Sequence, residues 1–444
     1  MKWVFLALMI AAATAISGWL RSKPKNAPVV WGLLGFLPFV LSPWHLIVAP
    51  YSTPLWPGFV KGWEFSALDA VAIAILVGTR VKSPRLIFAI PFFIYLGAVA
   101  IAVFQAKFGK LALAYVIQLV RIFIVYIAVS RVVTSDRGER AVLVGLVLGL
   151  SVQAGYAIWA RAGGALQTGG SLGHQNLLGF MSHMVLLPSF ALFLSGRSQR
   201  IALLGVIAGL TVVILTASRA TIAFSAIGLV LTMIMSMGMK FTGRKVLYAA
   251  VGIVLLGASY PLARASLDRR FEVQKLEFFD ENQERDAFMK AARAMLSDNP
   301  LGVGPNHYVY VANMEGYSAR AGVAWQATSR GTSVHNSFML ALVETGYLGL
   351  ITLLVLLASA IWYAFATCFR FRDRPGAELL IGVGCAIVAI CLHGLYEWMF
   401  LVFPTQYLFG ISLGLITGVR SRFLESSVKR LREQRLTAQA VGVV

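Results

Sequence analysis

Charged side chains are scarce in this chain of 444 residues. Asp, Glu, Lys and Arg together make up 13% of it, against roughly 25% in an average soluble domain. Hydrophobic residues instead account for 58%. These proportions exclude an ordinary soluble enzyme and a disordered chain, and the lack of charged outer faces excludes a coiled coil.

Cysteine is also scarce, with only Cys368, Cys385 and Cys391, all in or beside late apolar runs. Their spacing fits neither a disulfide framework nor a zinc site, so we interpret them as small buried thiols. The chain lacks a P-loop, a GxGxxG turn after a strand, an HExxH helix and a DxD pair. We therefore expect neither ATP hydrolysis nor a bound metal or other cofactor.

Long apolar runs, by contrast, are abundant. A membrane-spanning helix needs about 20 apolar residues, so each run is a candidate span. We keep the first run as a span because the basic cluster after it is unusual for a cleaved signal peptide. The sequence predicts an all-α polytopic membrane protein with about 12–13 transmembrane helices and one large periplasmic loop. The thirteen candidate spans are residues 3–20, 28–48, 65–79, 86–104, 111–130, 141–160, 174–194, 201–217, 220–239, 246–262, 336–365, 379–400 and 404–418.

Basic residues are concentrated in every second connection between these runs. One set of connections carries 23 Lys and Arg, and the short ones between them carry 5. Cytoplasmic loops are enriched in Lys and Arg, so we assign the first set to the cytoplasm, and an odd number of spans then puts the N-terminus outside. The basic loops thus account for the net charge of +20. We do not expect nucleic-acid binding, because the sequence lacks aromatic residues interleaved with basic ones. The basic set comprises residues 21–25, 80–85, 131–140, 197–200, 240–245 and 370–374 and the tail from 420.

One polar segment of 73 residues interrupts the pattern, with nine basic and nine acidic side chains. Structureless loops of this length are uncommon and usually functional. We divide the chain into an N-terminal transmembrane bundle of about ten spans, a periplasmic catalytic loop, C-terminal transmembrane helices and a basic cytoplasmic tail, which we expect to lie on anionic lipid. These parts are residues 1–262, 263–335, 336–418 and 419–444.

The large loop contains one clear helical pattern, NQERDAFMKAARAML, at residues 282–296. Apolar residues recur at helical spacing from Phe288 to Leu296, which is typical of an amphipathic helix. Arg285 lies three residues before Phe288 and so projects from the same face. A cation on the buried side of a helix needs an anionic partner. The alternative is a salt bridge to Glu281 one turn earlier.

Two further candidates lie at outward ends of spans. Arg219 sits at a junction of two apolar runs, beside the start of the next helix, where helix N–H groups and a guanidinium favour an anion. The alternative is an arginine that reaches lipid headgroups. His335 closes the large loop and opens an apolar helix, where a neutral imidazole can accept a proton near pH 7. Its alternative is a helix cap or an interfacial histidine.

Weaker signals come from five other outward positions. His174 and Asn176, in GGSLGHQN, stand at a helix start, where capping explains Asn176. His393 and Glu397, in CLHGLYEW, are one turn apart near the outer end of a span, so both are candidates to line a cavity. His307, in GPNHY, reads as an exposed loop histidine with no clear partner.

Two ionisable residues fall inside spans, where charge is costly and needs a partner. Arg121 is interpreted as structural, paired with Asp69. Glu344 has no evident partner, although Gly346 and Gly349 beside it indicate a close helix contact.

Three pieces of sequence, in order, resemble the bacterial O-antigen ligase and polymerase superfamily. They are the Ser218–Arg219–Ala220 turn, the ERDAFMKAARAMLSDNPLGVGPNHY segment, and HNSFMLALVETGYLGL, which is the most specific. With the spans between, they cover roughly residues 174–365, while the upstream third is similar only in hydropathy. The chain departs from the family in having Ala220 where Gly is frequent, and in its thirteen candidate spans against the family's dozen or so.

The resemblance implies a metal-independent glycosyl transfer at the periplasmic face of the bacterial inner membrane. The donor would be a glycan on undecaprenyl diphosphate, and the acceptor hydroxyl would belong to lipid A–core in a ligase of lipopolysaccharide biosynthesis. Arg219 and Arg285 match the family's diphosphate-binding arginines, and His335 matches its proposed base. The candidate substrate-binding residues are Asn336, His174 and Asn176.

The chemistry of these residue types agrees with that role. Two guanidiniums can stabilise the charge left on a diphosphate, and a histidine can deprotonate the attacking hydroxyl. Attack opposite the leaving group inverts the anomeric centre, and no carboxylate pair of the glycosidase kind is needed.

Several alternatives stay open at this point. An O-antigen or exopolysaccharide polymerase would use the same residues, as would a protein O-oligosaccharyltransferase. A secondary transporter should show paired halves and ionisable groups near the midplane; no internal repeat is visible, but Arg121 and Glu344 are intramembrane charges. A non-enzymatic scaffold of a polysaccharide assembly complex is the remaining reading.

Overall fold

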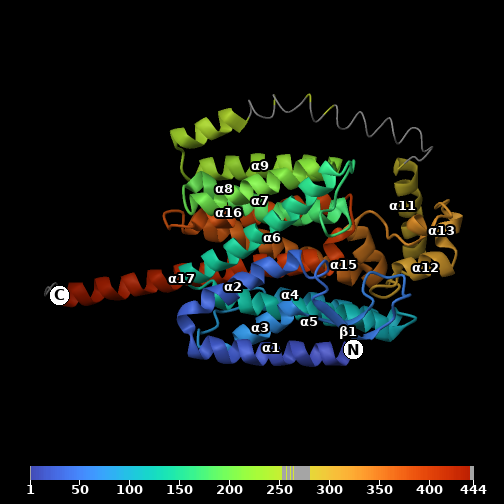
Figure 1. Ribbon diagram of the computed structural model, residues 1–444, viewed down its shortest axis with the longest axis horizontal. Helices are drawn as coiled ribbons and strands as arrows, with labels where there is room; N and C mark the ends of the chain where they lie inside the picture. Colours follow the sequence, from blue (N-terminus) through green and yellow to red (C-terminus); the bar gives the residue numbers. More distant parts are fainter. Residues whose placement is uncertain (1, 253–256, 258–260, 262–263, 265–280, 441–444) are drawn as a thin grey trace.

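Helices dominate the computed structural model (Figure 1). The structure describes residues 2–252, 257, 261, 264 and 281–440. Two short strands form the only sheet within this part of the chain. The prediction of an all-α polytopic membrane protein is confirmed.

Most of the bundle helices coincide with predicted apolar runs. Helices suit such runs because their backbone groups are satisfied internally. Serine side chains at residues 66, 135 and 218 each accept a hydrogen bond from the first turn of a helix and fix where it begins. The run at 246–262 lies partly outside the described residues. The bundle helices are α1 (Lys2–Ser22), α2 (Ala27–Phe36), α3 (Ala67–Gly78), α4 (Ala89–Ala102), α5 (Gly109–Val132), α6 (Asp136–Ala162), α7 (Gln175–Ser195), α8 (Gln199–Leu215), α9 (Arg219–Met239), α15 (Ser337–Arg370), α16 (Ala377–Gly394) and α17 (Phe403–Ala440).

Seven of the described helices are long and apolar enough to cross a membrane. They are α1, α5, α6, α7, α9, α15 and α16. Three shorter apolar helices, α3, α4 with its 3-10 extension to Gln105, and α8, run among them. The chain is therefore a multi-pass membrane protein.

Figure 1 shows the bundle helices side by side, with small helices of the large loop beyond one end and the C-terminal part of α17 beyond the other. We call these the loop end and the tail end. The N-terminus lies towards the loop end. The small helices are α11 (Glu281–Asp298), α12 (Tyr308–Met314), α13 (Tyr317–Arg320) and α14 (Ala327–Arg330), and short 3-10 turns are η1 (Pro24–Asn26), η2 (Leu37–Phe39), η3 (Val103–Gln105) and η4 (Met399–Leu401).

Ion pairs gather several basic segments at the tail end. Arg197 Nη2 and Arg422 Nη1 lie 2.8 and 2.9 Å from the same Asp136 carboxylate oxygen. Arg422 also pairs with Glu139. Residues 131–140, the connection at 197–200 and the start of the tail are thus neighbours, as their common basic character predicts.

The apolar run at 28–48 is not one helix, contrary to the prediction. α2 ends at Phe36, η2 follows, and the chain then enters strand β1 (Ile47–Ser52), which pairs antiparallel with β2 (Gly62–Ser66). Pro38, inside η2, contributes to the break because proline cannot donate the backbone hydrogen bond of a continued helix. Hydropathy alone gave no sign of this hairpin.

Glu344 fastens the large loop to the bundle. Its carboxylate accepts hydrogen bonds from the backbone N–H groups of Asn306 and Tyr308, at 2.8 and 3.0 Å. Two residues later Gly346 has a positive φ of 66° and kinks α15. A Cβ at Gly346 would lie 2.7 Å from the Leu301 carbonyl oxygen, so only glycine fits. The expected close contact therefore exists, but Gly346 makes it with the loop.

Arg121 is a structural cation, as predicted. Its Nε donates to Asp69 Oδ2 at 2.8 Å and its Nη2 donates to the Tyr407 hydroxyl at 2.6 Å. Glu64 lies 3.4 Å from Nη1. The buried guanidinium thus joins α3, α5 and α17 and satisfies the need of an intramembrane charge for partners.

We expect Asp69→Asn to destabilise the bundle by about 3 kcal/mol, because breaking a buried ion pair leaves an uncompensated charge. The double variant Asp69→Asn/Arg121→Met should lose less free energy of unfolding than the sum of the losses in the two single variants. Thermal unfolding in detergent measures both effects. Lys429→Gln, which removes an exposed pair with Glu433, should change stability by less than about 1 kcal/mol. Additive effects of the two buried substitutions would contradict the pairing.

Candidate active site

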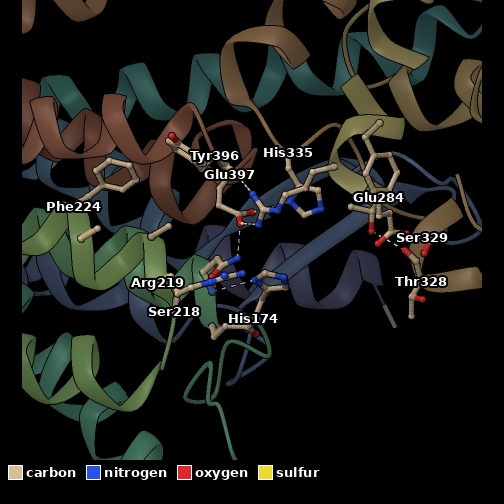
Figure 2. Close-up of a pocket in the computed structure, with 17 residues that line it drawn as sticks. His174, Ser218, Arg219, Phe224, Glu284, Thr328, Ser329, His335, Tyr396 and Glu397 are labelled. Atoms are coloured by element: carbon tan, nitrogen blue, oxygen red, sulfur yellow. Dashed lines mark hydrogen bonds and ion pairs between the residues drawn. The ribbon is translucent and has the colours of Figure 1, made fainter. Parts of the chain in front are cut away.

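A cavity of about 900 Å³ opens at the loop end, where five parts of the chain converge (Figure 2). Its walls come from the starts of α7 and α9, from α11, from the segment around α14 that leads into α15, and from the turn after α16. The lining residues that carry polar side chains are His174, Gln175, Asn176, Ser218, Arg219, Glu284, Arg285, Thr328, Ser329, Thr332, His335, Tyr396 and Glu397.

The structure brings most of the predicted site residues to this cavity. Its lining includes Arg219, Arg285 and His335, which are far apart in sequence, and also His174 and Asn176. Asn336 is not among the lining residues. Its side chain instead caps α15, accepting from Phe338 and Met339 N–H groups and donating to the Leu395 carbonyl.

A buried carboxylate, Glu397, links three of these side chains. It accepts a hydrogen bond from Arg285 Nη2 at 3.0 Å and one from Asn176 Nδ2 at 2.6 Å, both at Oε1. Its other oxygen, Oε2, lies 3.2 Å from His335 Nδ1. Glu397 is fully buried, whereas the Arg285 and His335 side chains are 34% and 21% exposed. The anion therefore lies behind the two groups that face the cavity.

The charge state of Glu397 follows from these contacts. Burial acts to raise the pKa of its carboxyl group, but the hydrogen bond from His335 and the positive charges of His335 and Arg285 outweigh burial and hold that pKa below its usual value. An ionised carboxylate can only accept hydrogen bonds. Nδ1 of His335 therefore carries a proton, and Nε2 is the nitrogen left for chemistry.

The break after α16 creates this arrangement. The predicted run at 379–400 is helical only to Gly394, and a turn with η4 follows. Glu397 leaves the helix at this turn, and its carbonyl accepts hydrogen bonds from the Ser337 N–H and hydroxyl. His393 stays in the helix and contacts His183, at 3.0 Å between ring nitrogens, inside the bundle. Of the two predicted cavity residues, His393 and Glu397, only Glu397 lines the cavity.

Arg285 reaches Glu397 from the predicted amphipathic helix, which is α11. Phe288 on the same face is buried, so the face does pack inward, and Glu397 is the anionic partner that Arg285 required. Nη1 of Arg285 also donates to the Tyr396 carbonyl at 2.8 Å. The side chain of Glu281, the alternative partner, lies outside the described side chains.

Arg219 is the first residue of α9, directly after the tight turn from α8. Ser218 caps this helix by accepting a hydrogen bond from the Thr221 N–H. Figure 2 shows Arg219 below the group formed by Glu397 and His335 and close to His174. The start of α9 therefore presents a guanidinium to the cavity with the positive end of a helix dipole behind it.

His174 caps α7, and this corrects the expectation that Asn176 does. Nδ1 of His174 accepts a hydrogen bond from the Asn176 N–H at 3.2 Å, which leaves the Asn176 side chain for Glu397. Burial lowers the pKa of His174, and the nearby His335 lowers it further. The negative charge of Glu397 acts to raise this pKa, but burial outweighs it. The capping nitrogen is thus unprotonated at neutral pH.

His307, expected to be exposed and without a partner, is buried outside the cavity lining. Its Nε2 accepts from the Phe108 N–H at 3.1 Å, and its Nδ1 lies 2.9 Å from the Pro305 carbonyl. His307 therefore fastens the large loop to the turn before α5.

We expect acidification to lower the stability of the His174→Asn variant less than it lowers the stability of the native chain. The unfolded histidine binds a proton as pH falls below its ordinary pKa of 6.5, whereas the folded one resists protonation, so this contribution is complete above that pH and lost below it. Asparagine keeps a capping side chain. Melting temperatures at pH 7 and pH 5 measure the difference, and identical losses in both proteins would refute a neutral capping histidine.

Comparison with known proteins identifies one family. Residues 203–354 match the family model described as O-Antigen ligase. No curated protein matches the chain. The matched segment contains Arg219, Arg285 and His335, so the resemblance drawn from the sequence is confirmed. The match assigns residues 203–354 of this multi-pass membrane protein to the O-antigen ligase superfamily.

Proposed function

We propose that the protein is a glycosyltransferase of the O-antigen ligase type, which moves a glycan from undecaprenyl diphosphate to a hydroxyl of lipid A–core. The observation that carries this proposal is one cavity lined by Arg219, Arg285 and His335. Two guanidiniums and an imidazole are the groups that transfer from a lipid diphosphate requires. The reaction proceeds without a metal ion and inverts the anomeric centre.

The two arginines form the donor side of the cavity. Arg285 uses Nη1 and Nη2 for Tyr396 and Glu397, but a guanidinium has five N–H donors. Its remaining donors and the Arg219 guanidinium bind the diphosphate oxygens. As the anomeric C–O bond breaks, its electron pair passes to the diphosphate, and both cations stabilise that charge.

His335 acts on the acceptor. Glu397 keeps the proton on Nδ1, so Nε2 offers a lone pair to the acceptor hydroxyl. The hydroxyl oxygen attacks the anomeric carbon while its proton passes to Nε2. The buried carboxylate then stabilises the imidazolium that forms, as in other carboxylate–histidine pairs.

The side of the membrane follows from charge. The tail end collects basic segments, including those at 131–140 and 197–200, and such segments remain in the cytoplasm. The loop end and its cavity then face the periplasm of a bacterial inner membrane. A lipid-linked donor already in the outer leaflet would reach the cavity from the side.

The contacts of the intramembrane charges argue against a transporter, whereas other glycan transferases stay as alternatives. A transporter would use intramembrane charges as movable sites, but Arg121 and Glu344 are each held by several hydrogen bonds. A polymerase or a protein O-oligosaccharyltransferase would use the same arginines and histidine, so the acceptor that accumulates glycan distinguishes these enzymes from a ligase.

We expect His335→Ala to reduce transfer at least about 100-fold, because general base catalysis contributes that much or more. The measurement uses purified protein with undecaprenyl-diphosphate-linked glycan and rough lipopolysaccharide. His45→Asn is the matched control, since His45 is exposed and has a positive φ that asparagine tolerates. Full activity of a folded His335→Ala protein would exclude His335 as the base.

We expect Glu397→Gln to lower kcat at least about tenfold while the protein stays folded. The amide keeps the size of the side chain but removes the charge that fixes the His335 tautomer and stabilises its imidazolium. Glu425→Gln, an exposed change at the tail end, should leave kcat unchanged. An unaltered kcat in Glu397→Gln would show that the carboxylate has no part in the reaction.

A further inference from the structure

One wall of the cavity has a chemistry unlike that of the arginine side. It consists of Glu284 from α11 with Thr328, Ser329 and Thr332 from the α14 segment, and we call it the hydroxyl wall. None of these four residues is a cation, and Glu284 is an anion. A diphosphate would be repelled here, so the wall requires a different ligand from the arginine side.

Glu284 has an unsatisfied oxygen on this wall. Its Oε1 atom is buried and has no hydrogen-bond partner among the described residues. A buried carboxylate oxygen without a donor is costly and rare. Glu284 and Arg285 are adjacent on α11 but point to different sides, because successive helical residues diverge. The unsatisfied Glu284 oxygen therefore requires a hydrogen-bond donor other than Arg285.

The hydroxyl wall is also held in shape. Arg330 of α14 donates to the Val323 and Ala324 carbonyls at 2.7 and 3.1 Å. Asn313 donates to the Arg330 carbonyl at 2.7 Å. The Thr332 hydroxyl donates to the Thr328 carbonyl, which leaves its lone pairs as acceptors. The wall is therefore organised before any ligand arrives.

Figure 2 shows where this wall lies relative to the base. His335 stands between Glu397 on one side and Glu284 with Ser329 and Thr328 on the other. A base in a transfer reaction must reach the nucleophile bound on one side while the leaving group is held on the other. The position of His335 meets that requirement when the nucleophile lies against the hydroxyl wall.

We propose that the hydroxyl wall is the subsite for the acceptor saccharide, an inference that rests on the proposed function. A sugar offers adjacent hydroxyls that both donate and accept. One hydroxyl donates to Glu284 Oε1, neighbouring ones pair with Ser329 and Thr332, and the reacting hydroxyl then faces His335 Nε2. Phe288 of α11 is buried against the His335 ring, with 5.6 Å between the ring centroids, and so helps to fix the position of the base beside this wall.

The test measures binding without the reaction. Core oligosaccharide released from rough lipopolysaccharide is titrated into the purified full-length protein without donor and followed by ligand-observed NMR. We expect Glu284→Gln to raise Kd about tenfold, since a hydrogen bond to a charged group is lost. Ser329→Ala should weaken binding less. Glu315→Gln, an exposed change on the same loop, is the matched control and should bind as the native chain does.

Kinetics then separate this subsite from the donor site. Glu284→Gln should raise the KM for rough lipopolysaccharide about tenfold and leave the KM for the lipid-linked donor unchanged, whereas Arg285→Lys should raise the donor KM. Equal oligosaccharide binding by Glu284→Gln and Glu315→Gln, or no binding by the native chain, would overturn the subsite. Binding that depends on Glu284, without transfer by the native chain, would instead support the subsite and refute the proposed reaction.

Discussion

The arrangement of the cavity depends on one buried anion, the Glu397 carboxylate. It contacts Arg285 from α11, His335 at the start of α15 and Asn176 at the start of α7. Burial of a carboxylate is costly unless it is paired, and these three donors compensate for the burial of Glu397. Three segments that are distant in sequence are thereby held to one geometry, with the Arg285 and His335 side chains turned towards the cavity.

A second set of contacts holds the large loop close to Glu397. Glu344 binds two backbone N–H groups of the loop, and Gly346 allows the loop backbone to approach α15 closely. Because packed contacts of this kind do not deform gradually, α11 has a defined position over the bundle. Arg285 and Glu284 then face two different sides of one cavity from adjacent positions on one helix.

The sequence accounted for much of this protein. Apolar runs placed most of the helices, and amphipathic spacing located α11 and required an anion for Arg285. The match between Arg121 and Asp69 was also visible, because each is a rare charge in an apolar run. Strands β1 and β2 and the break in the run at 379–400 were missed, since hydropathy records burial in an apolar phase and is nearly indifferent to backbone conformation.

By itself, the sequence determined that the chain crosses a membrane, which connections carry basic charge, and which side chains have the chemistry for transfer from a diphosphate. Only the tertiary structure decided that Glu397 is an anionic partner of Arg285, that His174 caps α7, and that the Asn336 side chain caps α15. The physical reason is that helical periodicity relates residues within a turn or two of each other, whereas a buried charge selects its partners through space.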